Sequence, residues 1–351
     1  MNKRKRIFGF DFIRMIATFS IVLIHYNAVY FYMNPQRYDL TLLTNSVSNI
    51  YLGSWGVSLF FILSGASLMY VYQEKLDLKK FYKKRFLSIY PMFWIAYVIA
   101  LLVQFYLYKG FTFAQVPIYN FILTIIGFDG NLMTVIPTFY ILGEWFLGCI
   151  IAMYIVFPLL RSMVNEIPIL TLVVILSIFV YMENYCTIPL ARDVIFLTRL
   201  PELCYGMYFV KYIKTINLPT FIVSIVIFVL NWIIKPSIPN DVQVLYIGIV
   251  SFNILIFISE FVKKSKVIVD ISNYISKYSY SIFLTHHVII AYVTSTFILN
   301  DLSKKGSCVL FLICCSLTMV ISKWLYNIEK KVVSKVKDYI LNVNYKKLKE
   351  G

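Results

Sequence analysis

Ten long apolar runs follow one another along the sequence, and each is close to the length with which a helix spans a bilayer. Such a helix needs about 20 mostly apolar residues. The runs cover residues 8–32, 51–72, 88–108, 139–160, 167–182, 194–212, 218–234, 242–262, 278–299 and 307–327. A protein surrounded by water cannot bury that much apolar surface, because 60% of the residues are hydrophobic and only 14% are charged. We therefore predict an all-α polytopic membrane protein with about ten transmembrane helices, in a single domain over residues 1–351.

The basic residues indicate on which side of the membrane each connecting segment lies. If the N-terminus is cytoplasmic, 24 of the 33 Lys and Arg residues fall in cytoplasmic segments and six in outer loops. Cytoplasmic segments of membrane proteins carry such an excess of positive charge. The pattern predicts cytoplasmic N- and C-termini, with a basic cytoplasmic tail over about residues 328–351. It also explains the net charge of +16 by contact with membrane lipids, without a nucleic-acid partner.

Three ionisable residues lie inside the first apolar run, where charge is costly to insert: Asp11, Arg14 and His25. Arg14 and His25 share one face of a helix and lie about 16 Å apart along its axis. Asp11 stands three positions before Arg14 and is expected to pair with it. Two interpretations stay open. Either Arg14 reaches the inner interface and His25 is a buried, hydrogen-bonded imidazole, or Arg14 binds an anionic donor and His25 transfers a proton deeper in the membrane.

The other two histidines, His286 and His287, are adjacent in the ninth run. Adjacent helical residues point about 100° apart, so His287 is expected to point away from His286. Because no Cys or carboxylate stands at ligand spacing, we predict no metal site. Glu144 begins the fourth run on the outer side. It is expected either to orient an imidazole or bind a sugar hydroxyl, or to be an ordinary interfacial residue.

A basic segment with interleaved aromatic residues, residues 79–85, separates the second and third runs on the cytoplasmic side. Lys84 and Arg85 close this segment. One interpretation is ordinary positive charge that contacts lipid headgroups. The other is a clamp for the phosphates of a nucleotide-bearing donor.

Five separated motifs, taken in order, resemble those of the acyltransferase-3 family of bacterial integral membrane acyltransferases. They are Arg14 with His25, residues 56–65 (GVSLFFILSG), residues 84–91 (KRFLSIYP), residues 145–147 (WFL) with Tyr154 and Pro158, and residues 280–286 (YSIFLTH). Two positions depart from the family pattern. Ser88 stands where a second Arg often follows Arg85, and Thr285 stands where many relatives have Trp.

The resemblance implies an acyltransferase, most simply an O-acetyltransferase, in the inner (cytoplasmic) membrane of a bacterium. It implies acetyl-CoA as the donor substrate, no permanently bound cofactor, and a hydroxyl of a cell-surface or lipid-linked glycan as the acceptor. Arg14, Lys84 and Arg85 would bind the donor. His25 would be the general base, with Arg14 and His286 beside it in the catalytic site. The alternative is an exporter or proton-coupled transporter of glycan or small molecules, with Arg14 and His25 in its pathway.

Overall fold

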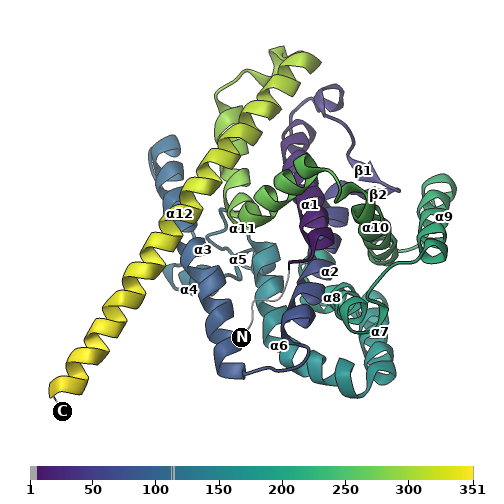
Figure 1. Ribbon diagram of the computed structural model, residues 1–351. Coiled ribbons are helices and arrows are strands. Elements are labelled where there is room, and N and C mark those ends of the chain that lie inside the picture. The colour runs from purple at the N-terminus through teal and green to yellow at the C-terminus, as the bar shows by residue number, and fades with distance from the viewer. Residues whose placement is uncertain (1–5, 112, 114, 351) are drawn as a thin grey trace.

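The structure is a computed structural model that describes residues 6–111, 113 and 115–350, and the side chains among them up to residue 336. Residues 3–5 and the side chains of the basic tail beyond residue 336, both assigned above to the cytoplasmic side, lie outside the described residues. The predicted helical chain is confirmed (Figure 1). The α-helices are α1 (Phe8–Phe31), α2 (Leu52–Tyr72), α3 (Leu78–Tyr108), α4 (Phe121–Ile126), α5 (Asp129–Leu132), α6 (Trp145–Glu166), α7 (Pro168–Tyr185), α8 (Leu200–Tyr208), α9 (Leu218–Ile234), α10 (Asn240–Val262), α11 (Lys266–Ser295) and α12 (Lys304–Glu350).

Short elements connect these helices. The described residues include one antiparallel hairpin, β1 (Ser46–Val47) with β2 (Ile50–Tyr51), which leads directly into α2. Single turns of 3₁₀-helix are η1 (Tyr38–Leu40), η2 (Ile118–Asn120), η3 (Arg192–Val194), η4 (Phe196–Arg199) and η6 (Leu299–Asp301), and η5 (Phe209–Ile213) is a π-helical continuation of α8. The apolar stretch 116–128, which is too short to span a membrane, contains η2 and α4.

Seven helices of the described chain are long and apolar enough to cross a membrane: α1, α2, α3, α6, α7, α10 and the Lys304–Val336 part of α12. The protein is therefore a multi-pass membrane protein. Three further apolar runs form helices that fall outside this group. Helix α9 has 17 residues, α8 is short even with its π-helical continuation, and α11 carries many polar side chains. The count of ten spans and the cytoplasmic termini remain predictions.

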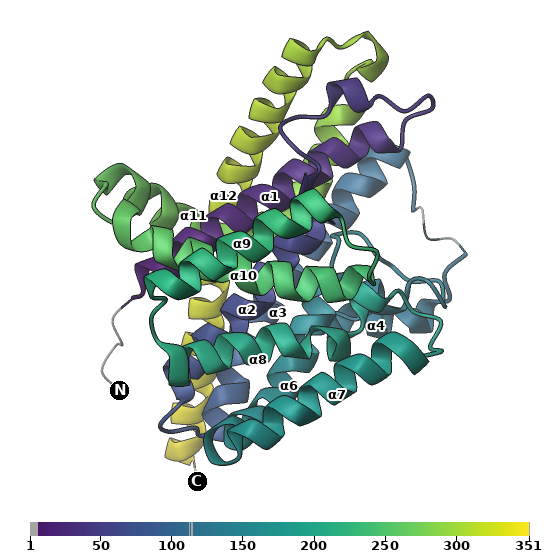
Figure 2. The ribbon, with the colours of Figure 1, turned by 90° about the vertical axis from the view of Figure 1, so that its right-hand side faces the viewer.

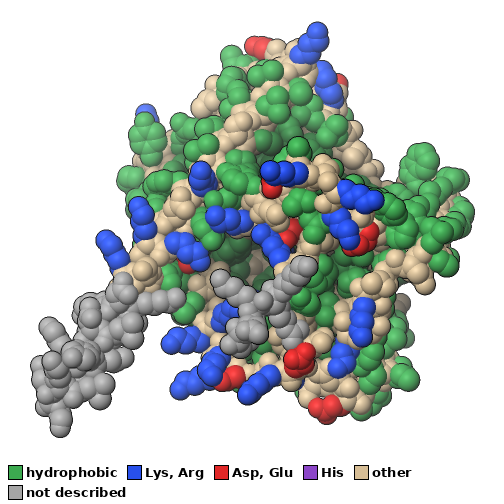
Figure 3. Space-filling model, viewed as in Figure 1, with side chains coloured by type: hydrophobic (Ala, Val, Ile, Leu, Met, Phe, Trp, Pro, Cys, Tyr) green, Lys and Arg blue, Asp and Glu red, His purple; other side chains and the backbone are tan. Residues whose placement is uncertain are grey.

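Large apolar side chains cover the outside of the bundle. Ile169 and Leu170 on α7 are 79% and 54% exposed, and Trp232 on α9 is 61% exposed. Apolar surface this extensive is not stable in water but is solvated by lipid tails. Lys and Arg side chains spread over the centre and lower part of the face in Figure 3, below and beside areas of apolar surface.

Helix α1 lies at the centre of the bundle, where it packs against α2, α10 and α11 (Figures 1 and 2). Helix α2 also packs against α8, and the backbones of these two helices are in contact. A Cβ atom at Gly65 would lie 1.8 Å from the carbonyl oxygen of Leu203, and one at Gly206 would lie 1.9 Å from that of Ile62. Glycines allow membrane helices to approach this closely. Their contact fixes the start of α8 relative to α1 and α2.

Candidate active site

One cavity of about 580 Å³ is enclosed by α1, α2, α3, α6 and α11. Arg14 and Arg85 line one part of it, which we call the arginine end. His25, His286 and Gly143 line another, which we call the histidine end. Because Arg14 and His25 are both on α1, the two ends are separated by about 16 Å along that helix. The cavity therefore connects the two side chains that sequence analysis placed on one helix face.

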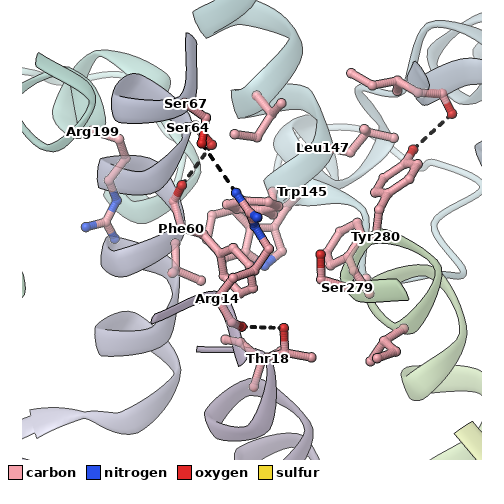
Figure 4. A pocket seen from close by; sticks show the side chains of 18 of the residues that line it. Arg14, Thr18, Phe60, Ser64, Ser67, Trp145, Leu147, Arg199, Ser279 and Tyr280 are labelled. Atoms are coloured by element: carbon pink, nitrogen blue, oxygen red, sulfur yellow. Dashed lines mark hydrogen bonds between the residues drawn. The ribbon is translucent and has the colours of Figure 1, made fainter. Parts of the chain in front are cut away.

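At the arginine end, Arg14 is held by polar side chains from three helices. Its Nη1 donates to Ser276 Oγ on α11 at 2.9 Å. Its Nη2 donates to Ser67 Oγ on α2 at 3.3 Å (Figure 4). The predicted pairing with Asp11 is confirmed, with Nη1 3.5 Å from Asp11 Oδ1. Asp11 also binds Arg6, so one carboxylate serves two cations. The guanidinium of Arg14 is oriented by this network and keeps contact with the cavity.

Arg85 is the second cation at this end. Its guanidinium lies 5.4 Å from the ring centre of Tyr154, and its buried Nε has no hydrogen-bond partner among the described residues. Lys84, which sequence analysis grouped with Arg85, is exposed and does not line the cavity, because adjacent helical positions face different directions. Ser88, found where relatives often have a second Arg, does line it.

At the histidine end, a hydrogen bond joins the two histidines on which the sequence analysis focused. His25 Nδ1 lies 2.8 Å from His286 Nε2. His286 is fully buried, and its Nδ1 faces the carbonyl oxygens of Phe283 at 2.8 Å and Ile282 at 3.0 Å. Carbonyl oxygens only accept, so His286 Nδ1 carries a hydrogen. In neutral His286 the Nε2 atom is then an acceptor, and His25 Nδ1 donates to it.

This assignment of hydrogens leaves one nitrogen of neutral His25 with a free lone pair. Nδ1 carries the hydrogen given to His286, so Nε2 is unprotonated and able to accept a proton. The interpretation of His25 as a hydrogen-bonded imidazole and its interpretation as a proton acceptor are therefore compatible. The same bond that satisfies the partly buried ring of His25 also selects the tautomer that a base requires.

His287 lies in the same cluster, although it points about 100° from His286 around α11. Its ring centre is 3.9 Å from that of His25 and 4.5 Å from that of His286. The 100° turn between adjacent residues holds, but the ring of His25 enters from α1 and contacts both. Gly143 packs on the other side of His287. A Cβ at Gly143 would lie 2.3 Å from His287 Cδ2, and its φ of +78° also favours glycine.

Glu144 fixes the loop that brings Gly143 to this position. Its fully buried carboxylate accepts from the backbone N–H groups of Leu142 at 2.6 Å and Ile141 at 3.3 Å. Glu144 precedes α6 and is outside that candidate span. Burial raises the pKa of its carboxyl to about 7. Of the roles considered for Glu144, the structure therefore supports an indirect one, in which it orients the loop against the imidazoles.

The three histidines are also the one group in the described chain whose ligand atoms are close enough to hold a metal ion, all within 4.8 Å of one another. Neutral imidazoles bind zinc well, and His286 already donates its other N–H to backbone carbonyls, as metal ligands commonly do. However, two nitrogens on a tetrahedral zinc are about 3.3 Å apart, which exceeds the 2.8 Å between His25 and His286. The geometry present is that of a hydrogen bond.

Sequence analysis gave no role to Arg199 or Trp145 in this cavity, although both line it. Arg199 is 3% exposed, and it is an ionisable residue inside an apolar run, the same signal that singled out Arg14. Trp145 was noted only as part of a motif. In Figure 4 it lies behind Arg14, while Arg199 lies apart from both at another wall.

The fold and the cavity define a membrane protein in which two arginines at one end of a cavity are connected to a hydrogen-bonded pair of histidines at the other. Residues 7–327 match the family described as "Acyltransferase domain", and the chain belongs to this acyltransferase-3 family. The protein is thus a multi-pass membrane protein whose acyltransferase-3 family domain covers most of the chain. It is also 31% identical over 126 residues to "Acyltransferase MdmB" of Streptomyces mycarofaciens. That match covers 34% of this chain and 31% of the relative, so the chain spans about a third of that relative's length. No solved structure matches significantly.

Proposed function

We propose that the protein is an O-acetyltransferase of the bacterial inner membrane. It takes an acetyl group from cytoplasmic acetyl-CoA and gives it to a hydroxyl of a cell-surface or lipid-linked glycan. The observation that carries the proposal is the single cavity with two arginines at one end and the hydrogen-bonded pair His25 and His286 at the other.

The arginine end supports an anionic donor. Arg14 and Arg85 supply two cations, and Arg85 Nε is a buried donor without a partner in the described chain. Phosphate oxygens match guanidinium groups in geometry and charge. Acetyl-CoA carries its phosphates and its reactive thioester at opposite ends of a long flexible molecule. Such a donor suits a cavity whose cationic end and histidine end are about 16 Å apart.

At the histidine end, the proposed acetyl transfer follows from which nitrogen atoms of His25 and His286 carry hydrogen. The acceptor hydroxyl gives its proton to His25 Nε2 as its oxygen attacks the thioester carbonyl carbon. A C–O bond forms, the C–S bond breaks, and the leaving thiolate takes the proton back from His25 to become the CoA thiol. His286 Nε2 accepts from His25 Nδ1 throughout and holds the ring in place. General-base catalysis of this kind typically contributes about 10²–10⁴-fold.

Two measurements test the proposal. Purified protein in vesicles is supplied with radiolabelled acetyl-CoA on one side and surface glycan on the other, and the glycan is recovered and counted. Mass spectrometry then compares surface glycan from cells with and without the protein. We expect label in the glycan, and an acetyl mass difference that requires the protein. Glycan that crosses the vesicle membrane without gaining label would contradict the proposal and favour the exporter.

A further inference from the structure

A buried ion pair at another wall of the cavity has no role in the transfer described above. Arg199, the last residue of η4, and Glu202 in the first turn of α8 are 3% and 1% exposed. Their closest contact is only 3.5 Å, from Arg199 Nη1 to Glu202 Oε1. Arg199 Nε and Glu202 Oε2 have no hydrogen-bond partner among the described residues. Buried polar groups are nearly always paired, so an unpaired donor at a cavity wall indicates a ligand.

Besides its contact with Glu202, Arg199 is positioned by hydrogen bonds to the backbone of its own segment. The backbone carbonyl of Val194 accepts from Asn131 Nδ2 at 2.8 Å and from Cys149 Sγ at 3.1 Å, which ties the segment before Arg199 to α5 and α6. Thr198 closes the same segment by donating to the carbonyl of Arg192 at 2.8 Å. The contact of α2 with α8 fixes the other side. Arg199 therefore lines the cavity on a rigid support, while its Nε remains unpaired.

The charges at this wall differ from those at the arginine end. Glu202 balances the charge of Arg199, and Asp193, which also lines the cavity, adds a negative charge. The sum is negative at neutral pH if all three groups are ionised. At the arginine end, Arg6 and Arg14 share the carboxylate of Asp11, and Arg85 adds a further positive charge. A polyanion is attracted to the arginine end, whereas the Arg199 wall offers hydrogen bonds without a net positive charge.

We propose that Arg199, with Glu202 behind it and Asp193 on the same cavity, forms the acceptor subsite and takes an uncharged hydroxyl-rich ring. This inference rests on the proposed function, since it assigns the acceptor of that reaction. A sugar hydroxyl accepts from a guanidinium and donates to a carboxylate, so it complements both kinds of group. A sugar bearing a carboxylate is disfavoured by Asp193.

The test measures binding without turnover. Purified protein in nanodiscs is titrated with a panel of methyl hexosides, each paired with the methyl uronoside in which the exocyclic CH₂OH is a carboxylate. CoA is titrated separately. We expect at least one neutral hexoside to bind about tenfold more tightly than its uronoside partner. The double variant Arg199→Gln with Glu202→Gln keeps the pair neutral and similar in volume, and is expected to weaken hexoside binding about tenfold while CoA affinity stays within about twofold.

Two further variants sharpen the result. Glu202→Gln alone removes one negative charge beside Arg199 and should shift the preference toward the uronoside. Arg37→Gln, which removes a partly exposed arginine paired with Asp39 outside the cavity, is the matched control and should change the affinity for neither ligand. The proposal is overturned if no hexoside binds the folded wild-type protein, if uronosides bind more tightly than hexosides, or if the double variant binds hexosides normally. Loss of CoA binding in the wild type would instead overturn the proposed donor.

Discussion

His25 Nδ1 and His286 Nε2 are 2.8 Å apart, and this hydrogen bond joins α1 to α11 inside the cavity. The two residues are 261 positions apart in the sequence. Since the backbone carbonyls behind His286 fix the hydrogen on its Nδ1, the bond leaves His25 Nε2 free to accept a proton. The rate of transfer should therefore depend on both histidines, in different ways.

Replacing His25 by Gln should lower kcat about 10²–10⁴-fold, because the base is removed while a neutral side chain remains in the span. Acetyl transfer per folded molecule and CoA affinity are the measurements. Tyr26→Phe is the control, since it changes the next residue of α1 but removes a hydroxyl that bonds Ser307 away from the cavity. It should lower stability without lowering turnover of the folded protein. Near-normal transfer by His25→Gln would show that another group is the base.

His286 should act through His25, so the chemistry of its replacement matters. His286→Gln offers an amide oxygen that can accept from His25 Nδ1, whereas His286→Leu offers none. We expect the Leu variant to lose at least about tenfold in kcat and the Gln variant to lose less, with the KM for acetyl-CoA similar in both. Equal losses in the two variants, in proportion to the loss of folded protein, would indicate that His286 only packs.

The donor should depend on Arg14 and Arg85 but not on every arginine nearby. Arg14→Gln and Arg85→Gln are expected to weaken CoA binding by about tenfold each, and Arg14→Lys by less, because Lys replaces a planar fork with a point charge. Arg161 serves as the control. It donates to the carbonyls of Tyr72 and Gln73 and does not line the cavity, so Arg161→Gln should leave CoA affinity unchanged. Unaltered CoA affinity in both test variants would exclude the clamp.

Gly143→Ala should damage the histidine end specifically. The added Cβ would lie 2.3 Å from His287 Cδ2, so the ring, and His25 beside it, must shift. Gly127→Ala is a close match, because its φ of +80° imposes the same strain of about 1–2 kcal/mol, yet its nearest neighbour is the flexible Ile151 side chain at 3.1 Å. Melting temperatures should fall similarly in both variants. Only Gly143→Ala should lose turnover, and equal turnover would show that the His287 contact is unimportant.

The loop before α6 should become less stable as the pH rises through neutrality. The pKa of Glu144 is raised to about 7 in the folded protein, so folding favours the protonated carboxyl. Its contribution to stability is complete below the unfolded pKa of about 4.3 and is lost as the pH rises through about 7. In Glu144→Gln this dependence should vanish. Thermal unfolding of both proteins between pH 4 and pH 8 tests this, and parallel curves would refute it.

Local patterns in the sequence are sufficient to predict the class of this protein. A bilayer requires that backbone polar groups be satisfied within each span, so a long apolar run predicts a helix whatever its neighbours are. Helical periodicity likewise places Arg14 and His25 on one face and Asp11 beside Arg14, and the structure contains that ion pair. The motifs that resemble acyltransferase-3 proteins are also local, and the family match over residues 7–327 confirms them.

The composition of the active site was decided by tertiary packing. Whether His287 faces His25, and whether Lys84 or Arg85 reaches the cavity, depends on how α1, α3 and α11 are rotated against one another. Arg199 becomes a cavity residue because the glycine contact between α2 and α8 brings its segment to the wall. Periodicity states which residues of one helix share a face, but it does not state which faces of different helices meet. That relation results from close packing across the whole bundle, so only the three-dimensional structure contains it.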